Sequence, residues 1–154
     1  MAFAEVRDEI KTILEAVDGI GEVHDFVRHT VFWNEYLRDH IEAGQINTWE
    51  ITRTATAQEL ISVQGSAGTE PFYHDTHSVV IVGRMSLTDD EKSEQDFQAL
   101  VDRIVAAFRV NNLLNNKVLL PKQAQVPIIE HRMFGGILIH YCEITFEAVE
   151  RVGG

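Results

Sequence analysis

The sequence has 154 residues, of which 45% are hydrophobic and 24% charged, and 24 acidic against 13 basic residues give a formal net charge of -11. These values are typical of one globular domain and argue against a disordered chain. The acidic balance, without a cluster of Lys or Arg, argues against a protein that binds a nucleic-acid backbone, because such binding depends on basic side chains.

The single cysteine, Cys142, excludes an internal disulfide, and its place in an apolar strand pattern indicates a small buried side chain. Charged residues interrupt the first apolar stretch, MAFAEVRDEIKTIL, so we expect no signal peptide. No apolar run approaches the ~18 residues that a membrane-spanning helix needs. We therefore expect a cytoplasmic protein that does not bind a membrane.

The first predicted element is an amphipathic helix over residues 2–17, in which apolar residues recur at helical spacing. Gly19 follows the last of them and is a typical helix stop. Residues 22–30 alternate in a way that predicts a short strand. The aromatic-rich stretch at 29–44 then predicts a short helix or a turn-rich excursion.

Two strands are predicted at 46–63 and 73–87, separated by a glycine-rich mobile loop at 64–72. Trp49 lies on one face of the first strand, and we expect the polar face opposite it to meet water or a partner. The second strand is apolar on both faces in its middle, which predicts cover on each side. The polar face of the first strand consists of Thr48, Glu50, Thr52 and Thr54.

A capping box predicts the start of a second helix, with Thr88 as the N-cap and Glu91 reaching back to it. An apolar stripe from Phe97 to Phe108 spans three turns, and Asn111-Asn112 can end the helix near Arg109. A leucine-bearing connection follows at 111–125. Connections of that length without structure are usually functional or bound by a partner.

The C-terminal stretch predicts a β-hairpin, because two apolar runs flank Gly135 and Gly136 and a Gly-Gly pair supplies the positive φ values of a two-residue turn. The resulting register pairs Phe134 with Ile137 at the turn. On the predicted core face, Met133 pairs with Leu138, His131 with His140, Ile129 with Cys142 and Pro127 with Ile144. The other face sets Phe134, Arg132, Glu130 and Ile128 opposite Ile137, Ile139, Tyr141 and Glu143.

Helix, strands, helix and hairpin predict a single α+β domain over residues 1–154: an antiparallel or mixed β-sheet with two α-helices packed on one face and a C-terminal β-hairpin. The second face of the sheet then carries apolar residues without cover. Contiguous exposed apolar area usually marks a protein interface, and the alternative is a third layer formed by the chain's own loops. The predicted oligomer interface comprises Trp49, Phe134, Ile137, Ile139, Tyr141, Leu119 and Leu120.

No motif predicts catalysis, since the sequence has no Gly-x-Ser-x-Gly elbow, Walker motif or dinucleotide fingerprint. His74 and His77 stand three apart in a strand, so they project to opposite faces and do not predict a metal site. His131 and His140 face each other, but zinc needs further ligands, and we interpret them as a hydrogen-bonded core pair. We therefore predict no catalytic, cofactor-binding or metal-binding residue and no enzyme activity.

Five stretches carry a resemblance to a known family: Val6 to Val17, GIGEVHD at 19–25, INTWEITRTA at 46–55, FQALVDRIVAAFR at 97–109 and VPIIEHRMFGGILIHYCEITFEA at 126–148. Their arrangement resembles that of the tail terminator proteins, also called tail completion or minor tail proteins, of long-tailed bacteriophages and prophages. The likeness covers most of the chain and lies in pattern more than in signature.

The resemblance implies a structural virion protein that forms a homo-hexameric ring, caps the tail tube and joins it to the head connector. Its partners would be copies of itself, the tail tube protein and the head-tail connector protein, with no cofactor. Assembly would take place in the host bacterial cytoplasm, and DNA would pass through an acidic lumen without specific binding.

Two alternatives to a tail terminator remain open. One is another neck or tail-tube component, because those proteins share similar small folds. The other is a small ligand-binding or enzymatic α+β dimer, in which His131, His140 and Tyr141 would line a pocket.

Overall fold

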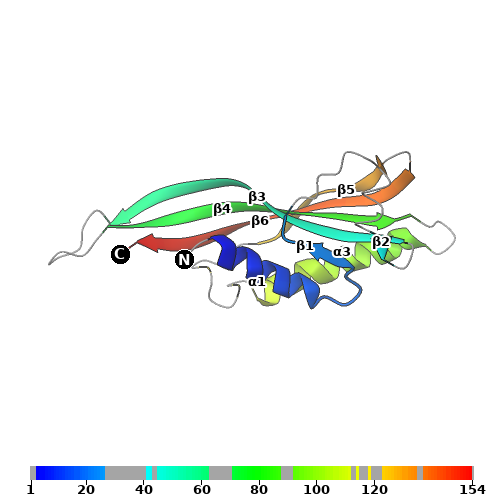
Figure 1. Ribbon diagram of the computed structural model, residues 1–154, viewed down its shortest axis with the longest axis horizontal. Coiled ribbons are helices and arrows are strands. Elements are labelled where there is room, and N and C mark those ends of the chain that lie inside the picture. The colour runs from blue at the N-terminus through cyan, green and yellow to red at the C-terminus, as the bar shows by residue number, and fades with distance from the viewer. Residues whose placement is uncertain are drawn as a thin grey trace.

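The computed structural model describes residues 3–26, 41–42, 45–62, 71–87, 92–111, 114, 118, 123–134 and 137–153. Within these ranges the chain forms two α-helices and six β-strands, and both helices pack on one face of a mixed sheet (Figure 1). The predicted α+β fold with two helices on one face is confirmed. The elements are α1 (Phe3–Glu15), β1 (Glu22–His24), β2 (Ile41–Glu42), β3 (Gln45–Ser62), β4 (Phe72–Ser86), α3 (Ser93–Val110), β5 (Gln125–Phe134) and β6 (Ile137–Gly153).

Three long strands form the centre of the sheet, whose order is β1-β3-β4-β6-β5, with β2 paired to β3 beside this path. Strands β3, β4 and β6 have 18, 15 and 17 residues and pair antiparallel. They extend past α1 as a three-stranded arm, which comprises residues 55–62, 72–78 and 147–153 (Figure 1). The sheet is thus longer than the helix layer that covers it.

The outer strands of the sheet are shorter than the central ones, so parts of β3 and β6 have an open edge. Strand β1 pairs in parallel with residues 48–50 of β3, and β5 pairs with β6 no farther than Thr145. Beyond those positions, no strand in the described ranges pairs with the outer edge of residues 51–62 or 146–153. The arm therefore has two edges without a partner strand in the described part of the chain.

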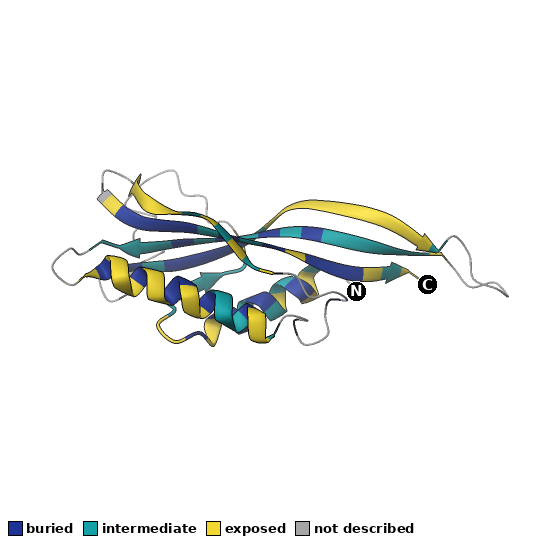
Figure 2. Ribbon diagram, turned by 180° about the vertical axis from the view of Figure 1, so that it is seen from behind, coloured by how far each residue is buried: buried dark blue, intermediate teal, exposed yellow. Residues whose placement is uncertain are grey.

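The hydrophobic core lies between the two helices and the side of the sheet that faces them, here called the helix face (Figure 2). Both predicted apolar stripes are buried there, because each helix turns one side toward the sheet and leaves the other in water. The core includes Val6, Ile10, Ile13 and Leu14 from α1, Phe97, Leu100, Val101, Ile104 and Phe108 from α3, and Trp49, Ile51, Val79, Ile81, Cys142 and Ile144 from the sheet.

Trp49 fills the middle of this core. Its indole stacks on Phe97 with ring centroids 6.0 Å apart, and its Nε1 donates a hydrogen bond to Asn47 Oδ1 at 2.8 Å. Gly83 is its neighbour across the strands, and a Cβ at that position would lie 2.2 Å from Trp49 Cζ3. The indole therefore occupies the space that any other residue at position 83 would need.

The N-terminal helix prediction is confirmed, whereas the predictions that follow it agree only in part. Helix α1 matches the predicted helix, and Gly19 after it has a φ of 87°, a conformation that glycine adopts without strain. Strand β1 spans three residues, shorter than predicted. Residues 41–42, predicted as part of a helix or turn-rich excursion, instead form strand β2. The rest of that excursion and most of the predicted loop at 64–72 lie outside the described residues.

Helix α3 begins later than predicted. Its N-cap is Lys92, in the left-handed conformation with φ 55° and ψ 43°, and no side chain caps the helix there. The predicted N-cap Thr88 and its partner Glu91 lie outside the described residues, and the left-handed Lys92 separates them from α3. The predicted C-terminal end near Asn111 is confirmed, because α3 ends at Val110.

The predicted hairpin register is confirmed from Phe134 paired with Ile137 to Ile128 paired with Glu143. The predicted pairing of Pro127 with Ile144 is wrong, because the register shifts between Gln125 and Ile128. Proline has no N–H to donate and interrupts a strand ladder at such bulges. The turn glycines lie outside the described residues.

The core face of this hairpin is only partly covered. Cys142 and Ile144 are buried, as predicted, whereas Ile129, Met133 and Leu138 are 44%, 60% and 44% exposed. Strand β5 is the edge of the sheet, and its outer part lies away from both helices (Figures 1 and 2). The alternation of apolar residues therefore predicted which hairpin residues share the core face, but not how far the helices cover that face.

The opposite face of β3, here part of the second face, is not solvated along its whole length. Thr54 is exposed, but Thr48 and Glu50 are 0% and 1% exposed, so the prediction that this side meets water or a partner is wrong for those two residues. Glu50 Oε1 lies 3.3 Å from Arg84 Nη1 on the neighbouring strand. The ion pair makes burial of the carboxylate tolerable.

Candidate functional site

Three of the seven predicted interface residues have side chains that the structure describes, and all three are buried. Trp49, Ile139 and Tyr141 are 0%, 1% and 6% exposed within their own chain. A side chain with so little surface cannot supply contact area to a second copy, so these three are removed from the predicted interface. The side chains of Phe134, Ile137, Leu119 and Leu120 lie outside what the structure describes.

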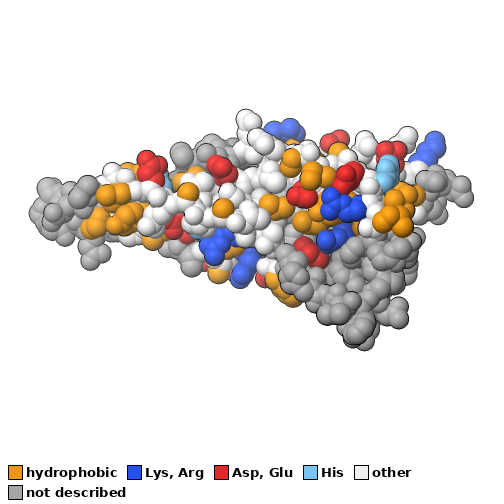
Figure 3. Space-filling model, turned by 90° about the horizontal axis from the view of Figure 1, so that it is seen from above, with side chains coloured by type: hydrophobic (Ala, Val, Ile, Leu, Met, Phe, Trp, Pro, Cys, Tyr) orange, Lys and Arg blue, Asp and Glu red, His pale blue; other side chains and the backbone are white. Residues whose placement is uncertain are grey.

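Exposed apolar side chains lie instead on the hairpin and near the tip of the arm (Figure 3). On the hairpin, Met133 pairs with Leu138 across the strands, and Ile129 lies on the same face four residues before Met133 on β5. We call these three residues the apolar row. At the far end of the molecule, Leu60 and Ile61 near the arm tip are 46% and 41% exposed. The two groups are candidates for contacts with other chains.

Charged residues cover Tyr141 on the second face of the hairpin. The Arg132 guanidinium lies 3.7 Å above the Tyr141 ring and donates hydrogen bonds to Glu130 Oε1. The hydrogen bond to Glu130 raises the pKa of Arg132. Burial, followed by the hydrogen bond that the phenol donates to Glu143, raises the pKa of Tyr141. The Arg132 guanidinium over the ring helps to explain why Tyr141 is buried beside an edge strand.

The predicted pocket of His131, His140 and Tyr141 does not form. The two histidine rings lie 5.2 Å apart, as the register predicts, but His131 is exposed while His140 is buried against Phe97 of α3. His140 Nε2 shares a 2.8 Å hydrogen bond with Ser93 Oγ rather than with His131. Tyr141, the next residue in the strand, projects to the opposite face, so the three side chains cannot line one pocket.

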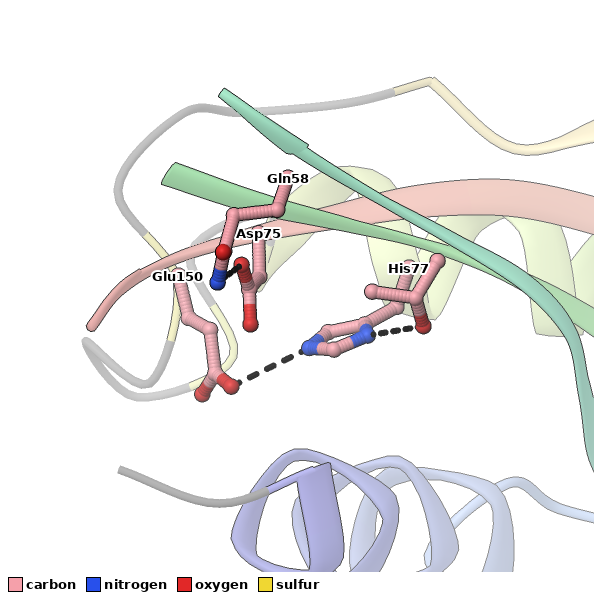
Figure 4. A network of polar contacts seen from close by, with 5 residues as sticks. Gln58, Asp75, His77 and Glu150 are labelled. Carbon is pink, nitrogen blue, oxygen red and sulfur yellow. Dashed lines mark hydrogen bonds and ion pairs between the residues drawn. The ribbon is translucent and has the colours of Figure 1, made fainter. Parts of the chain in front are cut away.

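A buried polar cluster lies on the helix face where the arm begins (Figure 4). His77 of β4 and Glu150 of β6 are 2% and 3% exposed, and His77 Nε2 lies 3.1 Å from Glu150 Oε1. The other ring nitrogen, Nδ1, lies 2.9 Å from the hydroxyl of Thr56 on β3. Both nitrogens of this imidazole on β4 therefore have a partner, one from β3 and one from β6.

Asp75 extends the cluster toward the arm tip. It pairs with Glu150 across β4 and β6, and its Oδ1 accepts a 2.7 Å hydrogen bond from Gln58 Nε2 (Figure 4). One ligand atom from each of Asp75, His77 and Glu150 lies within 4.8 Å of the other two. This arrangement contains the nitrogen and carboxylate oxygens that divalent metals prefer.

The first turn of α1 packs against the cluster. The Phe3 ring lies 5.0 Å from the His77 ring, and the Arg53 guanidinium lies 4.5 Å above the same phenylalanine. These contacts help to keep water from an imidazole and a carboxylate at the end of the helix layer. Sequence reasoning predicted the opposite projection of His74 and His77 but missed this cluster, because Glu150 stands 73 positions away from His77.

Cys142 has no role as a nucleophile in this arrangement. Its side chain is fully buried beneath the helices, and burial raises its pKa to about 12. A thiol in that state is almost entirely protonated at neutral pH and does not react readily. The predicted role as a small buried residue is confirmed.

Neither described helix is both long enough and apolar enough to cross a membrane. No protein-family model matches the sequence, and no curated protein is significantly similar to it. The exposed apolar groups, the open strand edges and the buried polar cluster are therefore the features from which a function can be inferred.

Proposed function

We propose that this chain is a structural subunit of a long-tailed phage or prophage tail, which assembles with copies of itself into a ring of the tail terminator type. The observation that carries the proposal is the three-stranded arm, which extends past the helices with both of its edges unpaired in the described ranges. The family resemblance supplies the identity of the assembly, and the arm supplies a physical reason to assemble.

Unpaired strand edges favour association because their free N–H and C=O groups accept a further strand. Monomeric proteins commonly protect such edges with lysine or proline. Residues 51–62 of β3, ITRTATAQELIS, contain neither, and the only charged residues there are Arg53 and Glu59. This edge is therefore suited to pairing with a strand of another chain.

The two candidate surfaces favour a ring over a two-fold dimer. The apolar row lies on the hairpin of β5 and β6, whereas Leu60 and Ile61 lie near the tip of the arm at the opposite end of the molecule (Figure 3). A contact in which the apolar row of one copy meets the arm tip of the next, without the reciprocal contact, is heterologous, and such contacts close into a ring when the rotation between neighbours allows it. A two-fold dimer would instead make every contact in both directions.

In the proposed ring, the tail tube protein and the head-tail connector protein contact opposite faces, and DNA passes through the lumen. The net charge of -11 supports a lumen along which DNA slides without binding, provided that the acidic residues face inward. A ring structure with a basic lumen would contradict this part of the proposal.

Light scattering coupled to size-exclusion chromatography tests the assembly. We expect a mass about six times the 17.4 kDa of one chain, and rings in electron micrographs. A stable dimer with a bound small molecule would support the enzymatic alternative, and open stacks of rings would indicate a tail-tube component. A monomer at high concentration would overturn the proposal.

A further inference from the structure

The buried polar cluster at the base of the arm contains more ligand atoms than a simple hydrogen-bonded pair requires. Asp75, His77 and Glu150 each place one donor atom within 4.8 Å of the other two. All three lie on the helix face of adjacent strands, two on β4 and one on β6. The cluster lies within the arm, but its side chains project from the helix face and not along the unpaired strand edges, so metal binding can be tested independently of ring assembly.

We propose that Asp75, His77 and Glu150 bind a divalent transition-metal ion, with Zn²⁺ as the best match. Imidazole nitrogen and carboxylate oxygen are ordinary zinc ligands at roughly 2.0–2.2 Å, so neighbouring donor atoms around a tetrahedral ion lie roughly 3.4 Å apart. His77 Nε2 and Glu150 Oε1 are 3.1 Å apart and already fit that spacing. Asp75 completes the set by a small inward rotation, which its partly exposed position allows.

Glu150 supplies independent support for a cation. Its side chain is almost fully buried, and its Oε2 has no hydrogen-bond partner among the residues that the structure describes. A buried carboxylate oxygen without a partner is costly, because it has lost water and gained nothing in return. A divalent ion bound by this carboxylate would compensate the negative charge that burial has removed from water.

Two side chains of β3 orient the ligands. The Thr56 hydroxyl lies 2.9 Å from His77 Nδ1, and when it accepts that proton it leaves Nε2 free to bind a metal. Gln58 holds Asp75 by its Oδ1. Partners of this kind behind the ligands are usual at metal sites, since they fix the orientation of each ligand.

The site has a structural role. Three protein ligands leave one coordination position of a tetrahedral ion for water. The ion joins β4 to β6 at the point where the arm leaves the helix layer, and Phe3 packs over the His77 ligand there. Metal binding should therefore stabilise the arm against the rest of the sheet.

Titration of the full chain with Zn²⁺ after treatment with a chelator tests the proposal. By calorimetry and native mass spectrometry we expect one ion per chain, and a melting temperature that rises with Zn²⁺ concentration. His77→Ala and Glu150→Gln should each weaken the binding roughly tenfold or more, and Thr56→Val about 10- to 100-fold. His74→Ala is the matched control, because His74 lies on the same strand but projects to the other face.

If His77→Ala binds Zn²⁺ as tightly as His74→Ala does, the proposed site is wrong, since the zinc would then be held by surface histidines. Absence of a bound ion in the unsubstituted chain would overturn it too and leave a hydrogen-bonded pair. If His77→Ala does not fold, as judged by circular dichroism, Asp75→Asn provides the same test at a partly exposed position.

Discussion

At the scale of single residues, the core is determined by contacts that combine distant parts of the chain. The apolar alternation around Trp49 predicted its face, but the close fit of the indole over Gly83 depends on a neighbour 34 positions away. The same reason hid the cluster of His77 and Glu150, which belong to strands paired only in the folded sheet. The spacing of residues along the sequence predicts the face of the strand onto which each side chain projects. Which side chains meet in a core or in a set of metal ligands depends also on the register between strands.

Gly83→Ala should destabilise the protein by roughly 1–3 kcal/mol, because the added methyl group overlaps the Trp49 ring. Urea unfolding followed by circular dichroism measures this cost. In a Trp49→Leu background the same substitution should cost clearly less, because the overlapping ring atoms are gone. An equal cost in both backgrounds would mean that the overlap is not the cause.

The stability of the protein should also fall at alkaline pH because of Cys142. Burial raises its pKa from 9.0 to about 12 in the folded state. The neutral thiol contributes fully to the free energy of unfolding below pH 9.0, where it is protonated in both the folded and the unfolded chain. This contribution is lost as the pH rises from 9.0 toward about 12, because the unfolded chain releases the proton first. Between pH 8 and pH 10.5 the free energy of unfolding should fall more in the natural chain than in Cys142→Ala, which keeps only the loss due to Tyr141 and other groups that titrate at alkaline pH. Thiol reagents should modify Cys142 only when the chain unfolds.

At the scale of elements, local signals predicted both helices, the long strands and the hairpin register, because periodicity and turn glycines act over a few residues. The capping box at Thr88 predicted an earlier start for the second helix than Ser93, where α3 begins after the left-handed Lys92. Local signals failed where cover from distant parts of the chain decides. The polar side chains of Thr48 and Glu50 predicted a solvated face, but both residues are buried, because parts of the fold distant in sequence cover them.

Arg84→Ala should destabilise the sheet by roughly 3 kcal/mol, because it removes the 3.3 Å ion pair of the buried Glu50 carboxylate. The double variant Arg84→Met with Glu50→Leu removes both charges and should be closer in stability to the natural chain. Thermal unfolding of the two variants compares them directly. If the double variant is no more stable than the single one, the buried charge is not the source of the loss.

At the scale of the whole molecule, the sheet is longer than the helix layer, as the arm shows, and part of the predicted second face is covered. Ile139 and Tyr141 are buried, while the arm extends past α1 and the apolar row of Ile129, Met133 and Leu138 is exposed on the hairpin. Alternation shows which residues share a face and cannot show how far another layer reaches. The surfaces proposed for ring assembly therefore became identifiable only from the sheet order.

A buried residue and an exposed one on the same hairpin should respond differently to an introduced charge. Ile139→Glu should unfold the chain or destabilise it by roughly 3 kcal/mol or more, because it buries an unpaired charge. Met133→Glu together with Leu138→Glu should leave the circular dichroism spectrum unchanged and lower the mass in light scattering toward 17.4 kDa. Val110→Glu is the matched control, since Val110 is 85% exposed on α3 and lies outside the apolar row. If the double variant keeps the ring mass of the natural chain, the apolar row is not part of the interface, and contacts along the arm would have to hold the ring together.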